Sequence, residues 1–544
     1  MLGPAFTRSG RQAPNPLVGA CAFAMAGICL LEAPSASAQV QVQTLAAPDL
    51  FSVGTGPSDL ASDLWRGSSA ALARAVIPQL GVKPLSPAAA ALARHVLSAG
   101  ANAPDGAGDD LELAAARARA VLQLGDALGA QVIAERTPSL AQKPALSQVA
   151  AEAALIRGQE DKACTVGDAL TAGRDAAFWM RLRAFCQARA GDTAAAQLTL
   201  DLALQQGESP DYARLMAAML AATDAGAGSL GDGLDYALSR HAASAWPAAL
   251  PTASTPVAVI VAHDPAVTPD ARFEAAARAA RAGFPAPDVY AAVSPPPTDV
   301  AGANQPGPAG EAALVALANS ASDPAVKEAA VTALLRRAGG AAEFETLARL
   351  TAPAIAQLIA ARAPLREPAL IAQAAAAAGD AASARAARAE VGSAGPPPSP
   401  LDLALLDALI AAASGQPVAE TIDAVSAAAG SEGAAGVSRA EAGAALLAAL
   451  GAPLNAQARF DLANADIGAG HLSAGRRLAL DSAARAGRMG DVALYVLAAA
   501  LDAGPGGPAP VDRVSLVRAL DQVGLKADAR ALAVEGLLPL QAHP

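Results

Sequence analysis

The sequence predicts an all-α protein, a right-handed α-solenoid of antiparallel helix hairpins interrupted by Pro/Gly-rich breaks. From residue 59 onward, runs of strong helix formers alternate with short Gly, Pro or Asp breaks, as in a series of consecutive helices. The two-residue alternation of apolar and polar side chains that marks a half-buried strand is almost absent. Equally spaced glycines, described below, indicate that the helices are paired in repeats.

Composition favours closely stacked helices and argues against two classes of partner. The chain has 544 residues, of which 53% are hydrophobic but only 3% aromatic. A core of Ala and Leu buries little area per residue, so such helices must pack closely, as they do in stacked arrays. The net charge of −11 and the scarcity of Lys make a nucleic acid or an anionic membrane surface a poor partner.

The first residues of the chain have the pattern of a signal peptide. Arg8 and Arg11 form a positive region, residues 16–31 form an uncharged apolar stretch, and residues 36–38 give the small-x-small pattern of a cleavage site after Ala38. The mature protein is therefore expected in the periplasm. Because the apolar stretch is shorter than the roughly 20 residues of a spanning helix, an uncleaved anchor is the less favoured alternative.

Two further features bear on export. The sequence "VGAC" ends at Cys21, which leaves a lipid-anchored form open, as is secretion. The longest later uncharged run, 242–262, is interrupted by Pro247, Pro251 and Pro256, and an interior Pro breaks a helix. We therefore expect no transmembrane segment in the mature chain.

The elements of the first half can be placed in order. Residues 39–58 are polar and show no helical period, so we expect a flexible lead-in. Breaks at Gly, Pro and Asp then delimit helices. The helices expected in the N-terminal part are 59–80, 86–99, 109–124, 126–136, 144–157, 160–172, 175–190, 193–206 and 210–224. Residues 257–262, "VAVIVA", fit either a strand or a short buried helix.

Three glycines in this part of the chain share a repeated surrounding. They are spaced 33 residues apart, and each is followed five residues later by Ala. An Ala also precedes each Gly by seven residues, and a large apolar residue precedes it by twelve. The Gly and Ala pairs are Gly125 and Ala130, Gly158 and Ala163, and Gly191 and Ala196.

This register predicts helix hairpins joined at glycine. A helix that ends at Gly can adopt the left-handed cap conformation there. The next helix then begins at Asp126 or Asp192, where an acidic side chain is favoured. The Ala residues on either side of Gly lie where the two helix backbones approach closely. Gly191, within "GDTAAAQLTL", is therefore interpreted as the joint between two helices.

The register resembles the tetratricopeptide repeat, a helix–turn–helix unit of about 34 residues. The best copy is "FWMRLRAFCQARAGDTAAAQLTLDLALQ", and the likeness covers roughly 109–208. It returns at 377–389 and 523–538, and more loosely at 468–480, where Gly475 takes the small position. The further joints are Gly379 with Ala384 and Gly524 with Ala529. The resemblance implies a superhelical scaffold that binds peptides or proteins on its concave face.

Pro/Gly-rich breaks at 226–233, 294–310 and 392–400, with a shorter one at 503–510, divide the array. Whether they are domain boundaries or loops between repeats is left open. The expected segments are a signal peptide (1–38), a lead-in (39–58), N-terminal helical repeats (59–226), an irregular helical region with a linker (227–310), middle repeats (311–395) and C-terminal repeats (396–544).

No catalytic, cofactor-binding or metal-binding constellation is recognisable. The histidines do not stand at metal-ligand spacing, and HExxH and CxxC are absent. "GAGSLG" at 226–231 matches GxGxxG, but it follows a helix and no βαβ unit surrounds it, so we interpret it as a loop. His263 beside Asp264 is weighed as a catalytic group against a plain surface histidine, which is favoured. Trp65 and Trp179 are expected to pack within helices rather than to stack on a ligand. Glu152 is expected on an outward face.

Cys164 and Cys186 are expected to form a disulfide. They are the only cysteines left after removal of a signal peptide, and an exported protein meets an oxidising compartment. Measured from the turn between helices 160–172 and 175–190, they stand about 15 and 18 Å away, nearly level across an antiparallel pair. Helices packed over Ala can bring Cα atoms to the roughly 5–6 Å that a disulfide prefers. The alternative is two buried free thiols.

Export, the repeat register and the missing catalytic groups favour a periplasmic, non-catalytic scaffold. We expect it to bind a protein or peptide partner of the cell envelope, with no cofactor and no metal. The alternative is an envelope enzyme on a helical solenoid that acts on cell-wall polymer. A Glu of raised pKa inside a cavity would favour the enzyme, and a groove without a perturbed acid would favour the scaffold.

Overall fold

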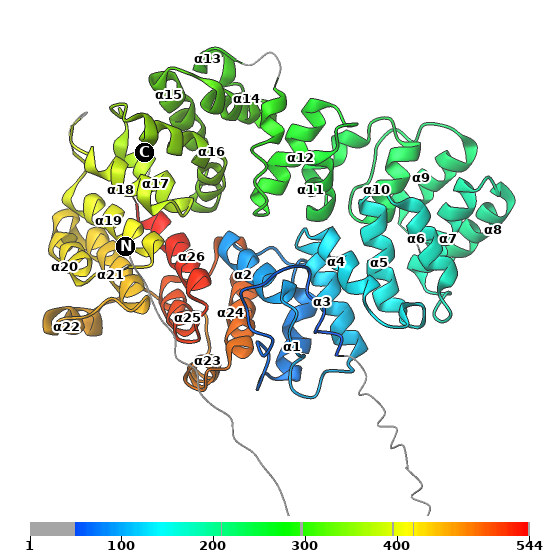
Figure 1. The fold of residues 1–544 in the computed structure, drawn as a ribbon, viewed down its shortest axis with the longest axis horizontal. Coiled ribbons are helices and arrows are strands. Elements are labelled where there is room, and N and C mark those ends of the chain that lie inside the picture. Colours follow the sequence, from blue (N-terminus) through cyan, green and yellow to red (C-terminus); the bar gives the residue numbers. More distant parts are fainter. Residues whose placement is uncertain (1–48, 208, 294–296, 394–396, 417, 542–544) are drawn as a thin grey trace, which may run out of the picture. The chain divides into compact units, whose positions relative to one another are not determined.

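Helices make up the regular structure of the described part of the chain. The computed structural model describes residues 49–541 except 208, 294–296, 394–396 and 417. Within those residues there is no strand, only three isolated bridges between single residue pairs. Successive helices pack on one another as in a solenoid (Figure 1), so the expected all-α class is confirmed.

The helices fall into an N-terminal and a C-terminal series. The first series is α1 (Ala70–Val76), α2 (Pro87–Ser98), α3 (Leu111–Gln123), α4 (Ala127–Glu135), α5 (Pro144–Ile156), α6 (Glu160–Ala169), α7 (Ala177–Arg189), α8 (Thr193–Leu204), α9 (Pro210–Ala221), α10 (Gly233–Ala242), α11 (Thr255–His263), α12 (Pro269–Arg281) and α13 (Val300–Ala303). The second is α14 (Gly307–Ser320), α15 (Pro324–Leu335), α16 (Ala341–Ala361), α17 (Pro368–Ala377), α18 (Ala381–Ala389), α19 (Pro400–Ser414), α20 (Ala419–Ala428), α21 (Gly433–Ala449), α22 (Ala456–Asn464), α23 (Ala474–Arg485), α24 (Met489–Ala503), α25 (Pro510–Gln522) and α26 (Lys526–Leu537). Short 3₁₀ turns lie between some of them, such as Ile77–Gln79 after α1.

Eight of the nine helices expected before residue 226 agree with α2–α9 to within three residues at each end. The helix expected at 59–80 is wrong in its first half, because residues 59–69 form turns and α1 begins only at Ala70, after the capping side chain of Ser69. Trp65 is fully buried, as expected, but in a turn rather than in a helix. The ambiguous run 257–262 is helical, within α11.

The five expected glycine joints share one backbone conformation. Gly125, Gly158, Gly191, Gly379 and Gly524 have φ values between 70° and 106° and connect consecutive helices. The Ala five residues after each is fully buried: Ala130, Ala163, Ala196, Ala384 and Ala529. Asp126, Asp192 and Asp380 cap the helices that follow, because each side chain accepts a hydrogen bond from a first-turn N–H.

The loose copy expected at 468–480 is not a joint. The chain there is an irregular segment that leads into α23, and Gly475 is exposed in the first turn of that helix. The joint in this part of the array is Gly487, with φ 66°, between α23 and α24. The Ala-rich composition of the chain made residues 468–480 resemble a repeat. Gly475, however, is exposed, whereas the residue at the same position of each true joint is buried.

Helices pack across each of the Pro/Gly-rich breaks. α9 contacts α10 across the first break, α12 contacts α14 across the second, and α17 and α18 contact α19 across the third. The described residues all belong to one compact unit by their contacts. In this structure the breaks are therefore connections between packed helices, and the second ends earlier than expected because α14 already begins at Gly307.

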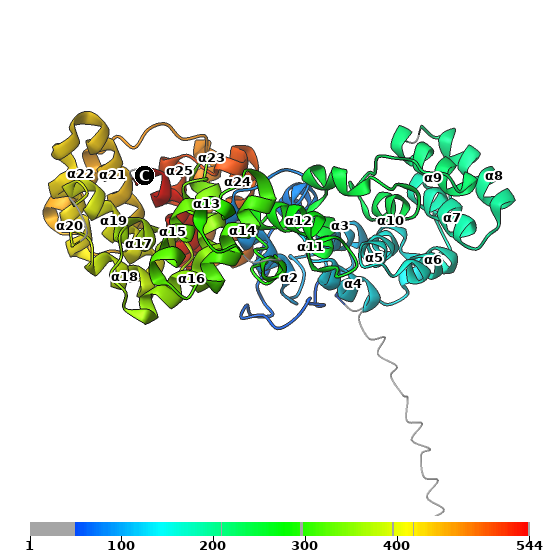
Figure 2. The ribbon, with the colours of Figure 1, turned by 90° about the horizontal axis from the view of Figure 1, so that it is seen from above.

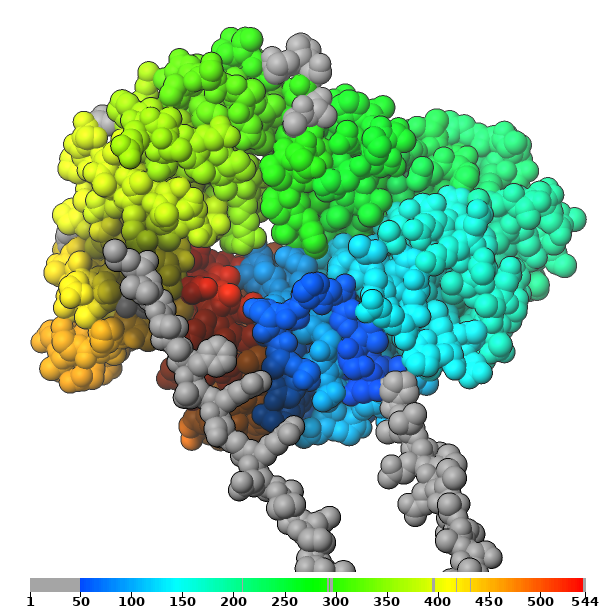
Figure 3. Space-filling view, in the orientation of Figure 1, coloured from blue at the N-terminus to red at the C-terminus, as the bar shows by residue number. Residues whose placement is uncertain are grey.

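The first helices pack on the last ones. α1 contacts α24, and α2 contacts both α24 and α26, so the two ends of the array lie side by side (Figures 1 and 2). The blue and red surfaces meet in the space-filling view (Figure 3). Asp491 of α24 accepts a hydrogen bond from the N–H of Ser69 at 2.9 Å, and Glu535 of α26 accepts one from the N–H of Ala88 at 2.9 Å. C-terminal carboxylates thus cap N-terminal helices.

A histidine adds a third link between the ends. The ring of His95 on α2 lies between Asp528 of α26, at 2.9 Å, and Asp59, at 2.8 Å. The hydrogen bond with Asp528, opposed by partial burial and aided by Asp59, raises the pKa of His95 to about 9. The imidazolium is therefore charged at neutral pH and joins two carboxylates from distant parts of the sequence.

The described end of the lead-in is held by a buried arginine. Residues 1–48, and with them the expected signal peptide and its cleavage site, lie outside the described residues. From residue 49 the lead-in is packed, and Phe51 is fully buried. Arg117 of α3, only 1% exposed, donates hydrogen bonds to the carbonyls of Phe51 and Val53 and to those of Leu97 and Ala99. One guanidinium therefore binds two carbonyls of the lead-in and two at the C-terminal end of α2.

The expected disulfide is confirmed. Cys164 of α6 and Cys186 of α7 are bonded, with a Cα–Cα distance of 5.7 Å. The bond lies beside a second hydrophobic core, formed by α5–α10 around Trp179, Phe185 and Tyr212. It therefore links the outer helix α6 to the helix that contributes most of the aromatic side chains of this core.

Replacing both cysteines by Ala should lower the free energy of unfolding by about 3 kcal/mol, because the disulfide closes a loop of 22 residues and restricts the unfolded chain. Urea unfolding of the protein, followed by hydrogen exchange in α6–α10, measures the effect. Reduced wild-type protein is the control and should match the double variant. An unchanged unfolding midpoint would show that the bond does not stabilise this core.

Candidate functional site

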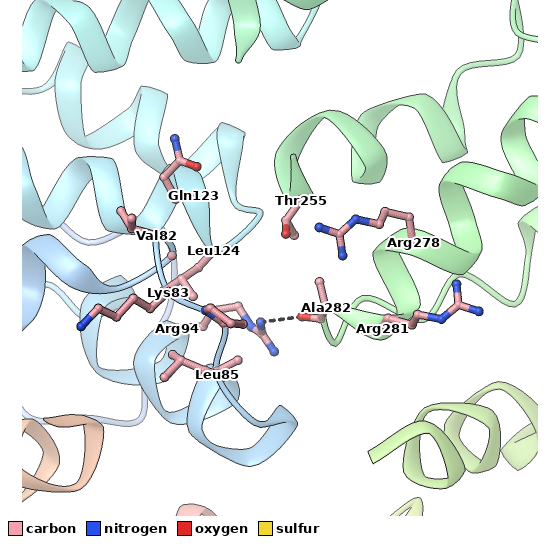
Figure 4. A pocket seen from close by; sticks show the side chains of 13 residues that line it. Val82, Lys83, Leu85, Arg94, Gln123, Leu124, Thr255, Arg278, Arg281 and Ala282 are labelled. Carbon is pink, nitrogen blue, oxygen red and sulfur yellow. Dashed lines mark hydrogen bonds between the residues drawn. The ribbon is translucent and has the colours of Figure 1, made fainter. Parts of the chain in front are cut away.

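Two adjoining cavities lie where the N-terminal helices meet α11 and α12. The first, of about 310 Å³, is lined by residues 81–85 and α2 on one side and by α11 and α12 on the other (Figure 4). The second, of about 570 Å³, is lined by α2, the joint between α3 and α4, α11 and Phe284. Arg94 lines both. We call the first the basic cavity and the second the apolar cavity.

Arg94 of α2 separates the two cavities. Its Nη1 donates a hydrogen bond to the carbonyl of Ala282 at 3.1 Å, at the C-terminal end of α12, where a positive charge is favoured. Its guanidinium carbon lies 4.6 Å from the centre of the Phe284 ring. Burial, together with the charge of Arg349, lowers the pKa of Arg94 to about 10. Arg94 therefore remains positively charged at neutral pH.

Three more basic side chains surround the basic cavity. Arg278 extends from α12 toward the gap that Arg94 faces from the other side (Figure 4), and its Nε donates to the carbonyl of Ala253 at 3.1 Å. Lys83 and Arg281 also line the cavity, and their charged ends point away from each other at its two sides. Together with Gln123 and Thr255, these groups give a lining rich in hydrogen-bond donors and free of carboxylates.

The apolar cavity is built from small and aliphatic side chains. Val121, Leu128, Val259 and Ile260 line it together with the ring of Phe284. Leu128 is 56% exposed, although it is a large apolar residue. The glycine joint between α3 and α4 is part of this wall. A Cβ on Gly125 would lie 2.5 Å from the Phe284 ring, so glycine is required there by packing as well as by its φ of 106°.

The acids of raised pKa lie outside these cavities. Glu152 of α5 is buried, not outward as expected, because α10 packs over α5 and covers it. Burial, and then the charge of Asp232, raise the pKa of Glu152 to about 7. Burial raises the pKa of Glu345 on α16 to about 7 as well, against the opposing charge of Arg349. Neither carboxyl lines the basic or the apolar cavity.

Glu152→Gln should stabilise the protein at pH 8 by about 3 kcal/mol and leave it nearly unchanged at pH 4. The folded pKa of about 7 exceeds the ordinary 4.5, so the protonated carboxyl stabilises the fold below pH 4.5. This contribution is lost as the pH rises through 7. Urea midpoints measured between pH 4 and 8 test this expectation. Glu112→Gln, on the exposed face of α3, is the control. Parallel pH profiles for wild type and Glu152→Gln would contradict it.

The structure distributes the residues predicted from the sequence over several places. Gly125 lines the apolar cavity, and Gly158 lines a separate shallow hollow beside Glu160 and Arg189. The remaining joints, Gly191, Gly379 and Gly524, line neither of the two cavities. His263 is half exposed at the end of α11, and its nearest carboxylate is that of Asp288 at 3.7 Å rather than that of Asp264. Residues 226–231 form a loop between α9 and α10, as expected.

Sequence reasoning missed the residues that line the two cavities. Arg278 stands on a helix with several other charged residues, a pattern typical of a solvated face, and Arg94 is a lone Arg beside His95 on an Ala-rich helix. Phe284 follows α12 directly after Gly283, which resembles an ordinary helix end. The only sequence signal for these cavities was Phe284 itself, because aromatic residues are rare in this chain.

In comparisons with known proteins, no family model, no curated protein and no solved structure matches the chain. Among the described helices, none combines the length and apolar character needed to cross a bilayer. The same residues contain no group of three or more His, Cys, Asp or Glu side chains that could hold a metal ion. The class that the fold defines is therefore an all-helical solenoid.

Proposed function

We propose that this protein is an exported, non-catalytic helical-repeat scaffold that binds a protein or peptide partner of the cell envelope. The observation that carries the proposal is the apolar cavity, a recess of about 570 Å³ lined by α2–α4 and α11. Concave sites with apolar walls and a few polar groups are typical of ligand binding. Here the polar side chains are those of Thr55, Arg94, His95, Ser98 and Asp126.

The buried acids favour a scaffold over an enzyme. A general acid of raised pKa must reach its substrate. Burial raises the pKa of Glu152, Asp235, Glu311 and Glu345, but none of these carboxyls lines the basic or the apolar cavity. This arrangement supports the proposed absence of catalysis and makes an enzyme acting on cell-wall polymer the weaker hypothesis.

The repeat joints support the tetratricopeptide-like part of the proposal. Five glycines of positive φ, each followed by a fully buried Ala, connect consecutive helices. A solenoid of this kind presents an extended surface for a partner. The proposed location, the periplasm after cleavage behind Ala38, rests on the sequence pattern alone. Mass analysis of the exported chain should find Gln39 as its first residue, whereas a lipid-modified Cys21 would support the anchored alternative.

A site-specific crosslink tests the scaffold proposal. A photoreactive amino acid at Leu128, an exposed wall residue of the apolar cavity, should capture a discrete envelope protein in living cells. The same group at Leu478 of α23, which is 65% exposed and outside both cavities, is the control. Leu128→Glu should then weaken binding of the captured partner by purified protein. Equal capture at both positions would contradict a partner site at this cavity.

A further inference from the structure

The basic cavity holds positive charges that have no carboxylate partner. In the described part of the chain, no Asp or Glu lies within ion-pair distance of Lys83, Arg94 or Arg278. Arg281, at the side of the cavity, is the exception, because Glu311 and Glu343 lie 3.4 and 3.8 Å from it. In a chain with a net charge of −11, three uncompensated cations around one recess make a local field of opposite sign.

The two central arginines are fixed in place by contacts to backbone carbonyls and an aromatic ring. One N–H of Arg94 is directed to Ala282, and its flat face lies over Phe284. One N–H of Arg278 is directed to Ala253. The guanidinium group carries five N–H donors in all. Each arginine is thus oriented by part of its donors, and the two side chains extend into the cavity from opposite sides (Figure 4).

The N-terminal end of α11 provides further donors. Thr255, the first residue of α11, lines the cavity beside Arg278 (Figure 4). Its neighbour Ser254 stands at the capping position, but its Oγ is buried and has no hydrogen-bond partner among the described residues. Free N–H groups and the helix dipole favour an anion at such an end. The helix end and the arginines therefore favour the same kind of ligand.

We infer that the cavity between α2 and α12 is a binding site for an anionic group, a carboxylate or a phosphate, held by Arg94 and Arg278 with Thr255 as a further donor. Both groups present oxygens that guanidinium binds through two parallel hydrogen bonds. A volume of about 310 Å³ admits such a group together with its first neighbours. The inference requires no partner protein and holds whether or not the scaffold proposal does.

The test uses the mature protein and two probes that separate the sources of the anion. Inorganic pyrophosphate represents phosphate, and a tetraglutamate peptide represents carboxylate. Isothermal titration at low salt should show binding of at least one probe, and binding should weaken as salt is added. Arg278→Gln should weaken that binding about tenfold, the loss expected for one charge-assisted contact. A tetraglutamine peptide should give no heat of binding.

Arg272→Gln is the matched control. Arg272 stands on the same helix, is also half-buried and also donates its Nε to a carbonyl, that of Ala262 at 3.0 Å, but it does not line the cavity. The Arg272→Gln variant should bind the probe with the same affinity as the wild type. Circular dichroism checks that both variants are folded. If Arg94→Gln is also folded, its affinity for the probe is a second test. Absence of binding by both probes, or equal weakening in Arg272→Gln and Arg278→Gln, would overturn the inference. Leu128→Glu tests the scaffold separately.

Discussion

Glu535→Ala should lower the free energy of unfolding by about 3–5 kcal/mol, the usual effect of removing one partner of a buried ion pair. Glu535 and Arg513 are both 4% exposed, and the Nη1 of Arg513 lies 2.8 Å from Oε1 of Glu535. The other carboxylate oxygen accepts the N–H of Ala88 in the first turn of α2. The variant would leave a buried cation without its partner and remove the acceptor at the start of a helix.

The effect should be concentrated where the two ends of the array meet. Urea unfolding gives the size of the loss, and hydrogen exchange in α2 and α26 gives its location. The double variant Arg513→Met with Glu535→Leu is the control, because it leaves no unpaired buried cation. It should lose less free energy of unfolding than Glu535→Ala, although the N–H of Ala88 loses its acceptor in both variants. If the free energy of unfolding of Glu535→Ala lies within about 0.5 kcal/mol of the wild-type value, the pair does not hold the ends together.

Arg117→Met should lower the free energy of unfolding by about 3–5 kcal/mol, because it removes the guanidinium donor from four backbone carbonyls. The carbonyl of Phe51 keeps a second donor, the N–H of Ala101. The distances from the guanidinium nitrogens to these carbonyl oxygens are 2.8–3.2 Å, and the side chain is buried. The cost of burying the cation, which lowers its pKa to about 10, is removed at the same time and offsets part of the loss.

Arg119→Met is the matched control for this variant. Arg119 lies two residues further along α3 and is exposed, so its loss should change stability by less than about 0.5 kcal/mol. Limited proteolysis between residues 49 and 58 should increase in Arg117→Met alone, because that segment loses two of its anchoring hydrogen bonds. Equal protease resistance in both variants would show that the lead-in is held by apolar packing of Phe51 instead.

The features that the sequence predicted well depend on residues close together in the chain. Gly191 ends one helix and Asp192 caps the next through contacts within a few residues, so the joint is visible in the sequence. The disulfide was predictable for a related reason. Cys164 and Cys186 stand on two consecutive helices joined by a short turn, so their pairing needs no knowledge of the rest of the array.

The burial of polar groups depends on elements that are distant in the sequence and pack over them. Glu152 has the position of an outward residue when α5 is considered with its neighbours in sequence, but α10 covers it. The lead-in has no helical period, and its order from residue 49 comes from Arg117, more than sixty residues away. The sequence does not show which third element will cover a given face.

The sequence by itself determined the helical class, the glycine joints and the disulfide, because capping, backbone conformation and hairpin pairing are local. Only the tertiary structure decided that Glu535 caps α2 across 447 residues, and that Arg94 meets the end of α12 across 188 residues. The physical reason is that such contacts follow from small angles between successive helices. These angles add up along the solenoid, and side-chain packing at every interface sets them.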